Sequence, residues 1–257
     1  MEAFEAYIAF RFRDGVLQPI KRPHMPDFHS LLHIDYQKEV LLQNTLQFVK
    51  GMPANDVLLW GARGTGKSSL VKSVLGLLAS EGLRLVQVYK MEIPHLSDLY
   101  ELFRNRREKF ILFFDDLFFD PKDEMLRVLK SLMEGDLEER PDNVLVYATS
   151  NRRHLVSETE EEEKFPEEGY QERISLVERF GIRLGFFPFG KEQYLSIVKS
   201  MVSKRNIKIE GQRLEDLALE WALSRGFSGR SASQFMKDLE GRLSLGFTFH
   251  KSYISQD

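Results

Sequence analysis

The chain has 257 residues, of which 42% are hydrophobic and 29% are charged, and its formal net charge is −3. These values are typical of a globular protein that buries its own core, and they provide no overall basic surface for nucleic acid. The absence of cysteine excludes disulfides, thiolate zinc sites and cysteine nucleophiles. The first residues lack the pattern of a signal peptide and no apolar run is long enough to span a membrane, so we expect a cytoplasmic protein.

The N-terminal segment is ambiguous. Residues 7–12 fit a short strand, and Asp14-Gly15 fits a turn after it. The prolines that follow favour an extended connection over a helix. We therefore expect residues 1–27 to be an N-terminal extension, followed by a helix over residues 36–49.

From residue 57 onward, short apolar runs alternate with helical stretches. The expected strands are residues 57–60, 83–88, 110–114, 144–148 and 185–187, and the expected helices between them are residues 68–78, 96–107 and 122–134. Because the strands are apolar on both sides, the pattern predicts a parallel sheet covered by helices on both faces. The fold class is therefore α/β, a three-layer sandwich over residues 28–188.

The strand pattern stops near residue 189. Apolar side chains then recur at helical spacing in three segments, which begin near Tyr194, Leu214 and Ser228. We therefore predict a small all-helical domain at residues 189–257. Before it, the acidic segment 157–169 lacks periodicity and fits either a solvated loop or a contact with a basic partner.

One loop matches the complete pattern G-x-x-x-x-G-K-[ST]. Glycines let successive backbone N–H groups face phosphate oxygens, and the following helix adds its N-terminal dipole. We expect Lys67 to reach the β- and γ-phosphates of ATP and the Ser68 hydroxyl to bind Mg²⁺. The apolar strand before the loop and the helix after it favour this interpretation over a glycine-rich turn without a ligand. The expected nucleotide-binding residues are Gly61, Ala62, Arg63, Gly64, Thr65, Gly66, Lys67, Ser68 and Ser69.

Two carboxylates follow the strand at residues 110–114. Asp115 and Asp116 lie where parallel sheets bind ligands, at the carboxyl end of a strand. We expect Asp115 to act on the Mg²⁺ side and Asp116 to orient or deprotonate the attacking water. Such a pair alone often marks only the end of a strand, but its position after the P-loop favours the functional interpretation.

Three more polar residues are candidates for the same site. Asn151 ends the strand near residue 148, where its amide would lie beside the γ-phosphate, although an asparagine there also fits the cap of a turn. Arg179 precedes the last strand, and Arg230 opens a C-terminal helix. Each arginine alone also fits a surface cation or a salt-bridge partner.

Together these elements resemble the AAA+ ATPase family, in the order Walker A, Walker B, sensor 1, arginine finger and sensor 2, over roughly residues 28–246. The sequence is similar to one bacterial subgroup, uncharacterised AAA+ ATPases catalogued as a domain of unknown function. The similarity lies in residues 58–70, 140–144 and 147–155. The name of that subgroup carries no known substrate.

The resemblance implies a role for each matching residue. Asn151 would be sensor 1, Arg230 would be sensor 2, and residues 33–37 would line the adenine side. Arg179 would be a finger that enters the ATP site of a neighbouring subunit in a homo-oligomer. Such a finger is worth about 10³–10⁵ in rate, so a lone subunit should hydrolyse ATP slowly.

The sequence departs from the family pattern at two places. Asp116 stands where most members have glutamate, which suits a switch more than a motor because its side chain is one methylene shorter. Residues 90–95, where a substrate-threading enzyme would carry an aromatic loop, contain no aromatic residue.

The partner is therefore unknown. We expect an oligomeric Mg-ATPase that remodels or loads a macromolecule; the alternatives are a helicase-loader-like switch with little turnover and an inactive scaffold. Nucleic acid stays open as a partner but is unsupported, because the basic clusters at residues 104–109 and 152–153 lack the alternating aromatics of a stacking platform.

Overall fold

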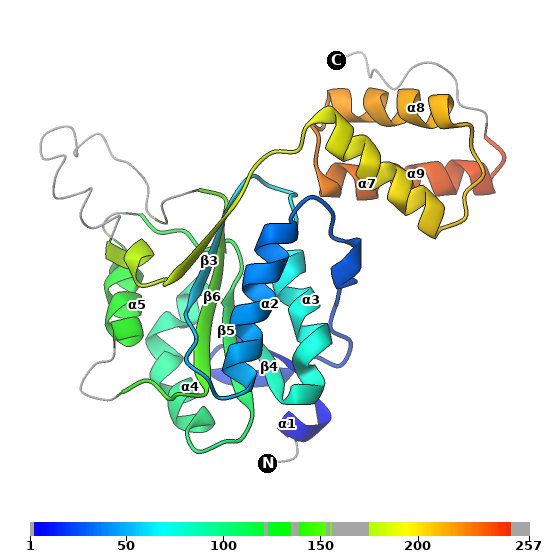
Figure 1. The fold of residues 1–257 in the computed structure, drawn as a ribbon. Helices are drawn as coiled ribbons and strands as arrows, with labels where there is room; N and C mark the ends of the chain where they lie inside the picture. Colours follow the sequence, from blue (N-terminus) through cyan, green and yellow to red (C-terminus); the bar gives the residue numbers. More distant parts are fainter. Residues whose placement is uncertain (1–2, 121–122, 135–138, 153–154, 156–174, 248–257) are drawn as a thin grey trace, which may run out of the picture. The chain divides into compact units, whose positions relative to one another are not determined.

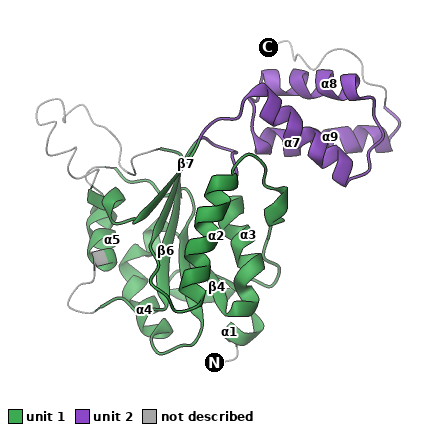
Figure 2. Ribbon diagram, in the orientation of Figure 1, with its two compact units in different colours: residues 1–61, 67–186 green, residues 62–66, 187–257 purple. Residues whose placement is uncertain are grey.

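The computed structural model describes residues 3–120, 123–134, 139–152, 155 and 175–247. The chain divides into two compact units (Figure 2): unit 1 comprises residues 1–61 and 67–186, and unit 2 comprises residues 62–66 and 187–257. The acidic segment 157–169, expected to be a solvated loop or a partner contact, lies outside the described residues.

Unit 1 is built on a seven-stranded sheet with the order β2-β1-β4-β5-β6-β3-β7. All neighbouring strands are parallel except β1 and β2, which form an antiparallel hairpin. Nearly every residue of β4, β5 and β6 is buried, as expected for strands covered on both faces. The strands are β1 (Ala9–Arg13), β2 (Val16–Pro19), β3 (Val57–Gly61), β4 (Leu83–Val88), β5 (Lys109–Phe114), β6 (Val144–Ser150) and β7 (Ile182–Phe186).

Helices cover both faces of this sheet. Figure 1 shows α2 and α3 on one face and α4 and α5 on the other, which confirms the predicted three-layer α/β fold. The helices of the described part of unit 1 include α1 (Ala3–Ala6), α2 (Asp35–Val49), α3 (Lys67–Leu78), α4 (Leu96–Phe103) and α5 (Glu124–Glu134). Helix α4 ends four residues before the predicted residue 107, because Arg104 leaves the helical region and Asn105 has a positive φ of 65°.

The N-terminal segment, for which the sequence predicted an extension with a short strand at residues 7–12, contributes two strands to the sheet. Strand β1 pairs with β4 in parallel, with Phe10 beside Val86, and so becomes part of the sheet. Phe10 and Phe12 share one face of β1 and are buried in the main hydrophobic core. The turn after β1 is anchored as well, because the buried Glu92 carboxylate accepts from the backbone N–H groups of residues 14 and 15 at 2.9 and 3.1 Å.

Within its described residues, 62–66 and 187–247, unit 2 contains three helices: α7 (Lys191–Lys204), α8 (Gly211–Leu223) and α9 (Gly229–Ser244). Their apolar faces pack together, with Tyr194, Ala218 and Met236 completely buried. Helix α9 begins at a capping serine, because the Ser228 hydroxyl accepts from the backbone N–H of Ser231 at 3.0 Å. Among the described helices of the whole chain, none is long and apolar enough to cross a membrane.

Candidate nucleotide-binding site

The P-loop connects the end of β3 to the first residue of α3. Gly61, Gly64 and Gly66 have positive φ values of 121°, 73° and 107°, a region that favours glycine. A Cβ at Gly61 would lie 2.1 Å from the backbone oxygen of Phe186, so the close approach of β3 to β7 also requires glycine there. Farther along, the Thr65 hydroxyl donates to the Ala62 carbonyl at 2.8 Å and closes the loop. The sequence therefore holds the loop in the bent form that a phosphate cradle needs.

Lys67 is the first residue of α3 and is only 6% exposed. Its Nζ donates to the Gly61 carbonyl at 2.7 Å and to Asn151 Oδ1 at 3.3 Å. A buried ammonium group that is satisfied by oxygen acceptors at a helix N-terminus is well placed to bind a phosphate.

Asp115 follows β5, and its carboxylate lies next to the P-loop helix. Its Oδ1 accepts from the Ser68 hydroxyl at 2.5 Å and from the Thr149 hydroxyl at 2.8 Å. Its Oδ2 lies 3.7 Å from Lys72 Nζ. The adjoining hydroxyl and carboxylate oxygens of Ser68 and Asp115 are hard ligands of the kind that Mg²⁺ prefers alongside phosphate and water. The predicted magnesium residues therefore fit the ion.

Asp116 adopts a left-handed backbone, with φ of 62°. Its backbone N–H donates to Thr149 Oγ1 at 2.8 Å, and its carboxylate accepts from the Asn151 side-chain amide at 2.5 Å. A positive φ at a residue other than glycine costs of order 1–3 kcal/mol and is found often at functional sites. The two contacts hold the Asp116 side chain at the carboxyl edge of the sheet, beside the end of β6.

Sequence reasoning assigned no role to Thr149 and Lys72. Thr149 bridges both aspartates, and it precedes Asn151 by two residues, so the alternation of a strand places both on one face. Lys72 follows Ser68 by four residues and therefore lies on the same face of α3. The two-residue period of a strand could have revealed Thr149 from Asn151, and the four-residue spacing on a helix could have revealed Lys72 from Ser68.

Residues 33–37 approach the same edge from α2. The Gln37 side chain donates to the Gly185 carbonyl at 2.8 Å, and Gly185 pairs with Trp60 just before the P-loop. His33 has a positive φ of 62°. The start of α2 is therefore attached to the strand next to β3.

In unit 2, the N-terminus of α9 lies against the middle of the P-loop. The backbone N–H of Arg230 donates to the Gly64 carbonyl at 3.4 Å, and a Cβ at Gly64 would lie 3.0 Å from the Ser228 side chain. The side chains of Arg230 and Arg63 are exposed. The backbone of Arg230, the predicted sensor 2 residue, thus contacts the loop directly.

Arg179 lies apart from the other predicted residues of unit 1. It follows a helical turn at residues 175–178, and its Nη1 donates to the Ser175 carbonyl at 2.5 Å. Three residues later, Ile182 begins β7 and pairs with Val57, the first residue of β3. Because β3 is parallel to β7 and ends at the P-loop, its length of about 16 Å separates Arg179 from that edge. The structure thus brings together Lys67, Ser68, Asp115, Asp116 and Asn151, and it leaves Arg179 at the opposite edge.

The sequence matches one family model, described as "Protein of unknown function (DUF815)", over residues 5–243. No curated protein matches the sequence.

Several solved structures share the fold. The RuvB Holliday junction branch migration motor of Thermotoga maritima superposes with a TM-score of 0.58 and 17% identity, over 84% of this chain and 64% of that one. PCH-2 of C. elegans superposes with a TM-score of 0.55 and 18% identity, over 83% of this chain and 64% of that one. A chain of the HORMA:CdnC:Trip13 complex of E. coli MS115-1 superposes with a TM-score of 0.54 and 13% identity, over 90% of this chain and 95% of that one. The present chain spans less than two thirds of the length of the RuvB and PCH-2 chains, and the likeness establishes the AAA+ fold.

Proposed function

The chain belongs to the DUF815 family of proteins of unknown function, and we propose that it is an oligomeric AAA+ ATPase that binds and hydrolyses Mg-ATP. Its nucleotide state would drive the remodelling or loading of a macromolecular partner. The observation that carries the proposal is the continuous set of hydrogen bonds from Lys67 through Asn151 to Asp116. Phosphate-binding, water-orienting and sensing groups are in direct contact at the edge where parallel sheets bind ligands.

Each side chain has a distinct task in this proposal. Lys67 and the P-loop amides bind the β- and γ-phosphates. Ser68 and Asp115 hold Mg²⁺, which would neutralise charge on the phosphate oxygens. Asp116 orients the attacking water and accepts its proton, and Asn151 holds the water and the γ-phosphate in line.

Arg179 acts in a neighbouring subunit. In its own subunit, the length of β3 separates it from the P-loop edge, so the local site lacks this cation. A head-to-tail contact between copies would place Arg179 of one copy at the ATP site of the next and would repeat around a closed ring. Arg230 would contact the γ-phosphate from unit 2 and so make the position of the helices depend on the nucleotide.

A nucleotide-dependent switch with little turnover is the second candidate. It is favoured by the short Asp116 side chain, whose carboxylate oxygen is already bound by the Asn151 amide. A base held in this way must release that amide before it can act on water.

Nucleic acid is not the favoured partner, although RuvB is a motor for Holliday junctions. In the cluster at residues 104–109, Arg104 pairs with Glu101 at 3.3 Å and Arg106 pairs with Glu108 at 3.5 Å. Arg106 also covers the Phe4 ring at 4.3 Å. These charges serve the fold of unit 1, which reduces what they can offer to phosphates.

The test is steady-state ATPase activity per subunit over a wide range of protein concentration, with Lys67→Ala as the blank. We expect the specific activity to rise with concentration and Arg179→Ala to abolish the rise. If ATP binds but activity stays absent at every concentration, the shared-site ATPase is refuted and the switch is favoured.

A further inference from the structure

The chain just after Arg179 runs unusually close to the residues that precede β3. A Cβ at Gly181 would lie 2.3 Å from Asn55 Oδ1, 2.8 Å from its Cγ and 3.0 Å from its Cβ. Gly181 does not have a positive φ, so the contact, and not the backbone conformation, requires glycine. Any side chain at residue 181 must displace Asn55 or be displaced by it.

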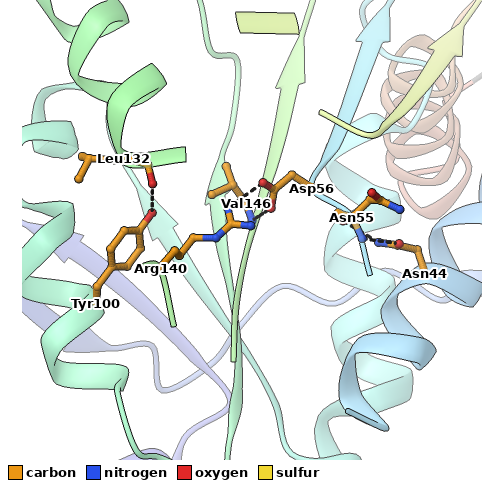
Figure 3. Close-up of polar contacts among 7 residues, drawn as sticks. All are labelled: Asn44, Asn55, Asp56, Tyr100, Leu132, Arg140 and Val146. Carbon is orange, nitrogen blue, oxygen red and sulfur yellow. Dashed lines mark hydrogen bonds and ion pairs between the residues drawn. The ribbon is translucent and has the colours of Figure 1, made fainter. Parts of the chain in front are cut away.

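Asn55 cannot move easily, because its backbone is held on both sides by one buried residue. Asn44 Nδ2 donates to the Asn55 carbonyl, and Asn44 Oδ1 accepts from the Asn55 N–H, each at 2.9 Å (Figure 3). Asn44 is 2% exposed and also donates to the hydroxyl of Tyr147 at 3.0 Å. Buried polar networks that are fully satisfied are rigid, so the backbone of Asn55 is fixed, and its Cβ, which would lie 3.0 Å from a Cβ at Gly181, is fixed with it.

Asp56, the next residue, is fixed from the other side. Its carboxylate accepts from the Val146 N–H and from Arg140, each at 2.7 Å (Figure 3). Its backbone carbonyl accepts from the Ile182 N–H at 3.2 Å. Residues 181 and 182 are thus held by steric contact with Asn55 and by a hydrogen bond to Asp56.

The turn that carries Arg179 transmits this constraint. The Arg179 N–H donates to the Leu176 carbonyl at 3.3 Å, and the Phe180 N–H donates to the Val177 carbonyl at 3.2 Å. Phe180 is 1% exposed. A closed turn of this kind moves as one piece. Arg179 lies at most about 7 Å from Gly181 along the chain, so a displacement at Gly181 also displaces Arg179.

We propose that Gly181 is a positioning residue for Arg179, and that Asn55 and Asp56 form the fixed platform on which it rests. The platform sets where the guanidinium is presented to the ATP site of the neighbouring subunit. This inference rests on the proposed role of Arg179 in trans.

The first measurement uses the full chain with the substitution Gly181→Ala. We expect its ATPase activity to fall about 100-fold at high protein concentration, since a misplacement of about 1 Å can cost that much. Binding of a fluorescent ATP analogue should remain, because the P-loop lies at the opposite edge. The double variant Asn55→Gly/Gly181→Ala removes all three contacting atoms of Asn55, and it should regain most of the activity.

The second measurement mixes variants. In a ring, Lys67→Ala subunits supply an arginine finger without an ATP site, and Arg179→Ala subunits supply the ATP site without a finger. Random mixing in equal amounts makes roughly a quarter of the interfaces complete. A mixture of Gly181→Ala with Lys67→Ala should regain activity, as the mixture of Arg179→Ala with Lys67→Ala does. The reason is that the P-loop of the Gly181→Ala subunit is intact. Simple loss of stability would not produce this gain.

The outcomes separate the inference from the proposed function. If neither mixture gains activity, the trans role of Arg179 falls, and the inference falls with it. If only the mixture with Arg179→Ala gains activity, the shared site stands and the positioning role of Gly181 is overturned. Wild-type activity of Gly181→Ala, or failure of the double variant to recover while the single variant still binds nucleotide, overturns the inference as well.

Discussion

The side-chain amide of Asn151 donates a hydrogen bond to the carboxylate of Asp116, with 2.5 Å between the nitrogen and the oxygen. The oxygen of the same amide accepts from Lys67 at 3.3 Å. One side chain therefore joins the proposed base to Lys67, the lysine proposed to bind phosphate. A phosphate bound at Lys67 would compete with the Asn151 oxygen, so the proposed nucleotide binding would be linked to the position of the proposed base.

The substitution Asp116→Asn tests the base. Asparagine tolerates the left-handed backbone at this position, so the fold should remain. We expect ATP binding to persist and turnover to fall by roughly 100-fold or more, since a general base contributes about 10²–10⁴ in rate. The control is Asp120→Asn, which makes the same chemical change at an exposed position in the segment that follows. This variant should keep wild-type turnover. Normal turnover of Asp116→Asn would remove this residue from the mechanism.

Thr149→Val tests the bridge between the two aspartates. Valine keeps the shape but removes one of the two hydroxyl donors to Asp115 Oδ1, which keeps its bond from Ser68, and it leaves the Asp116 N–H unsatisfied. Unsatisfied groups of this kind cost about 1–3 kcal/mol, and we expect denaturant unfolding to show a loss in that range. The Mg²⁺ concentration for half-maximal activity should also rise. Thr149→Ser keeps the hydroxyl and should restore both values; equal behaviour of the two variants would contradict the bridge.

Substitutions in the buried ion pair of Asp56 and Arg140 test the stability of the platform that Asn55 and Asp56 form. Arg140→Met removes the cation and leaves a carboxylate that is 6% exposed, which should cost about 3–5 kcal/mol at neutral pH. Burial raises the pKa of Asp56, although the charge of Arg140 opposes this. A raised pKa in the folded state favours folding below the unfolded pKa, and this contribution is lost as the pH rises through the folded pKa. The penalty of Arg140→Met should therefore shrink toward acidic pH.

Urea unfolding at neutral and acidic pH measures this penalty. The double variant Asp56→Asn/Arg140→Met should be less destabilised than Arg140→Met alone at neutral pH, because it lacks the unpaired charge. A penalty that does not change with pH would show that the carboxyl group stays ionised without its partner.

Two buried tyrosines predict how the protein responds to alkali. Burial raises the pKa of Tyr100 to about 12 and that of Tyr147 to about 12. Both therefore stabilise the folded state below the unfolded pKa of about 10, and this stabilisation is lost as the pH rises from about 10 to 12. Unfolding free energies across this range should fall by about 2–3 kcal/mol for each tyrosine, and Tyr100→Phe should reduce the slope. A slope that Tyr100→Phe leaves unchanged would contradict the assignment to this residue.

That the P-loop, Asp115, Asp116 and Asn151 meet could be predicted from the sequence, because each follows a buried strand and parallel strands end at one edge of a sheet. The contact of Gly181 with Asn55 could not be found this way, because it joins segments far apart in the chain through atoms that no periodicity predicts. The alternation of Phe10 and Phe12 indicated a strand, but its partner β4 is selected by tertiary packing.

The hairpin of β1 and β2 has a practical consequence for anyone who shortens the chain. A version that begins at Phe28 would leave the backbone of β4 as the outer edge of the sheet, ready to pair with another molecule. It would also remove Phe4, Phe10 and Phe12 and expose to water the apolar surface that they cover. We expect such a version to aggregate during purification, even though every residue of the candidate nucleotide-binding site would remain in it.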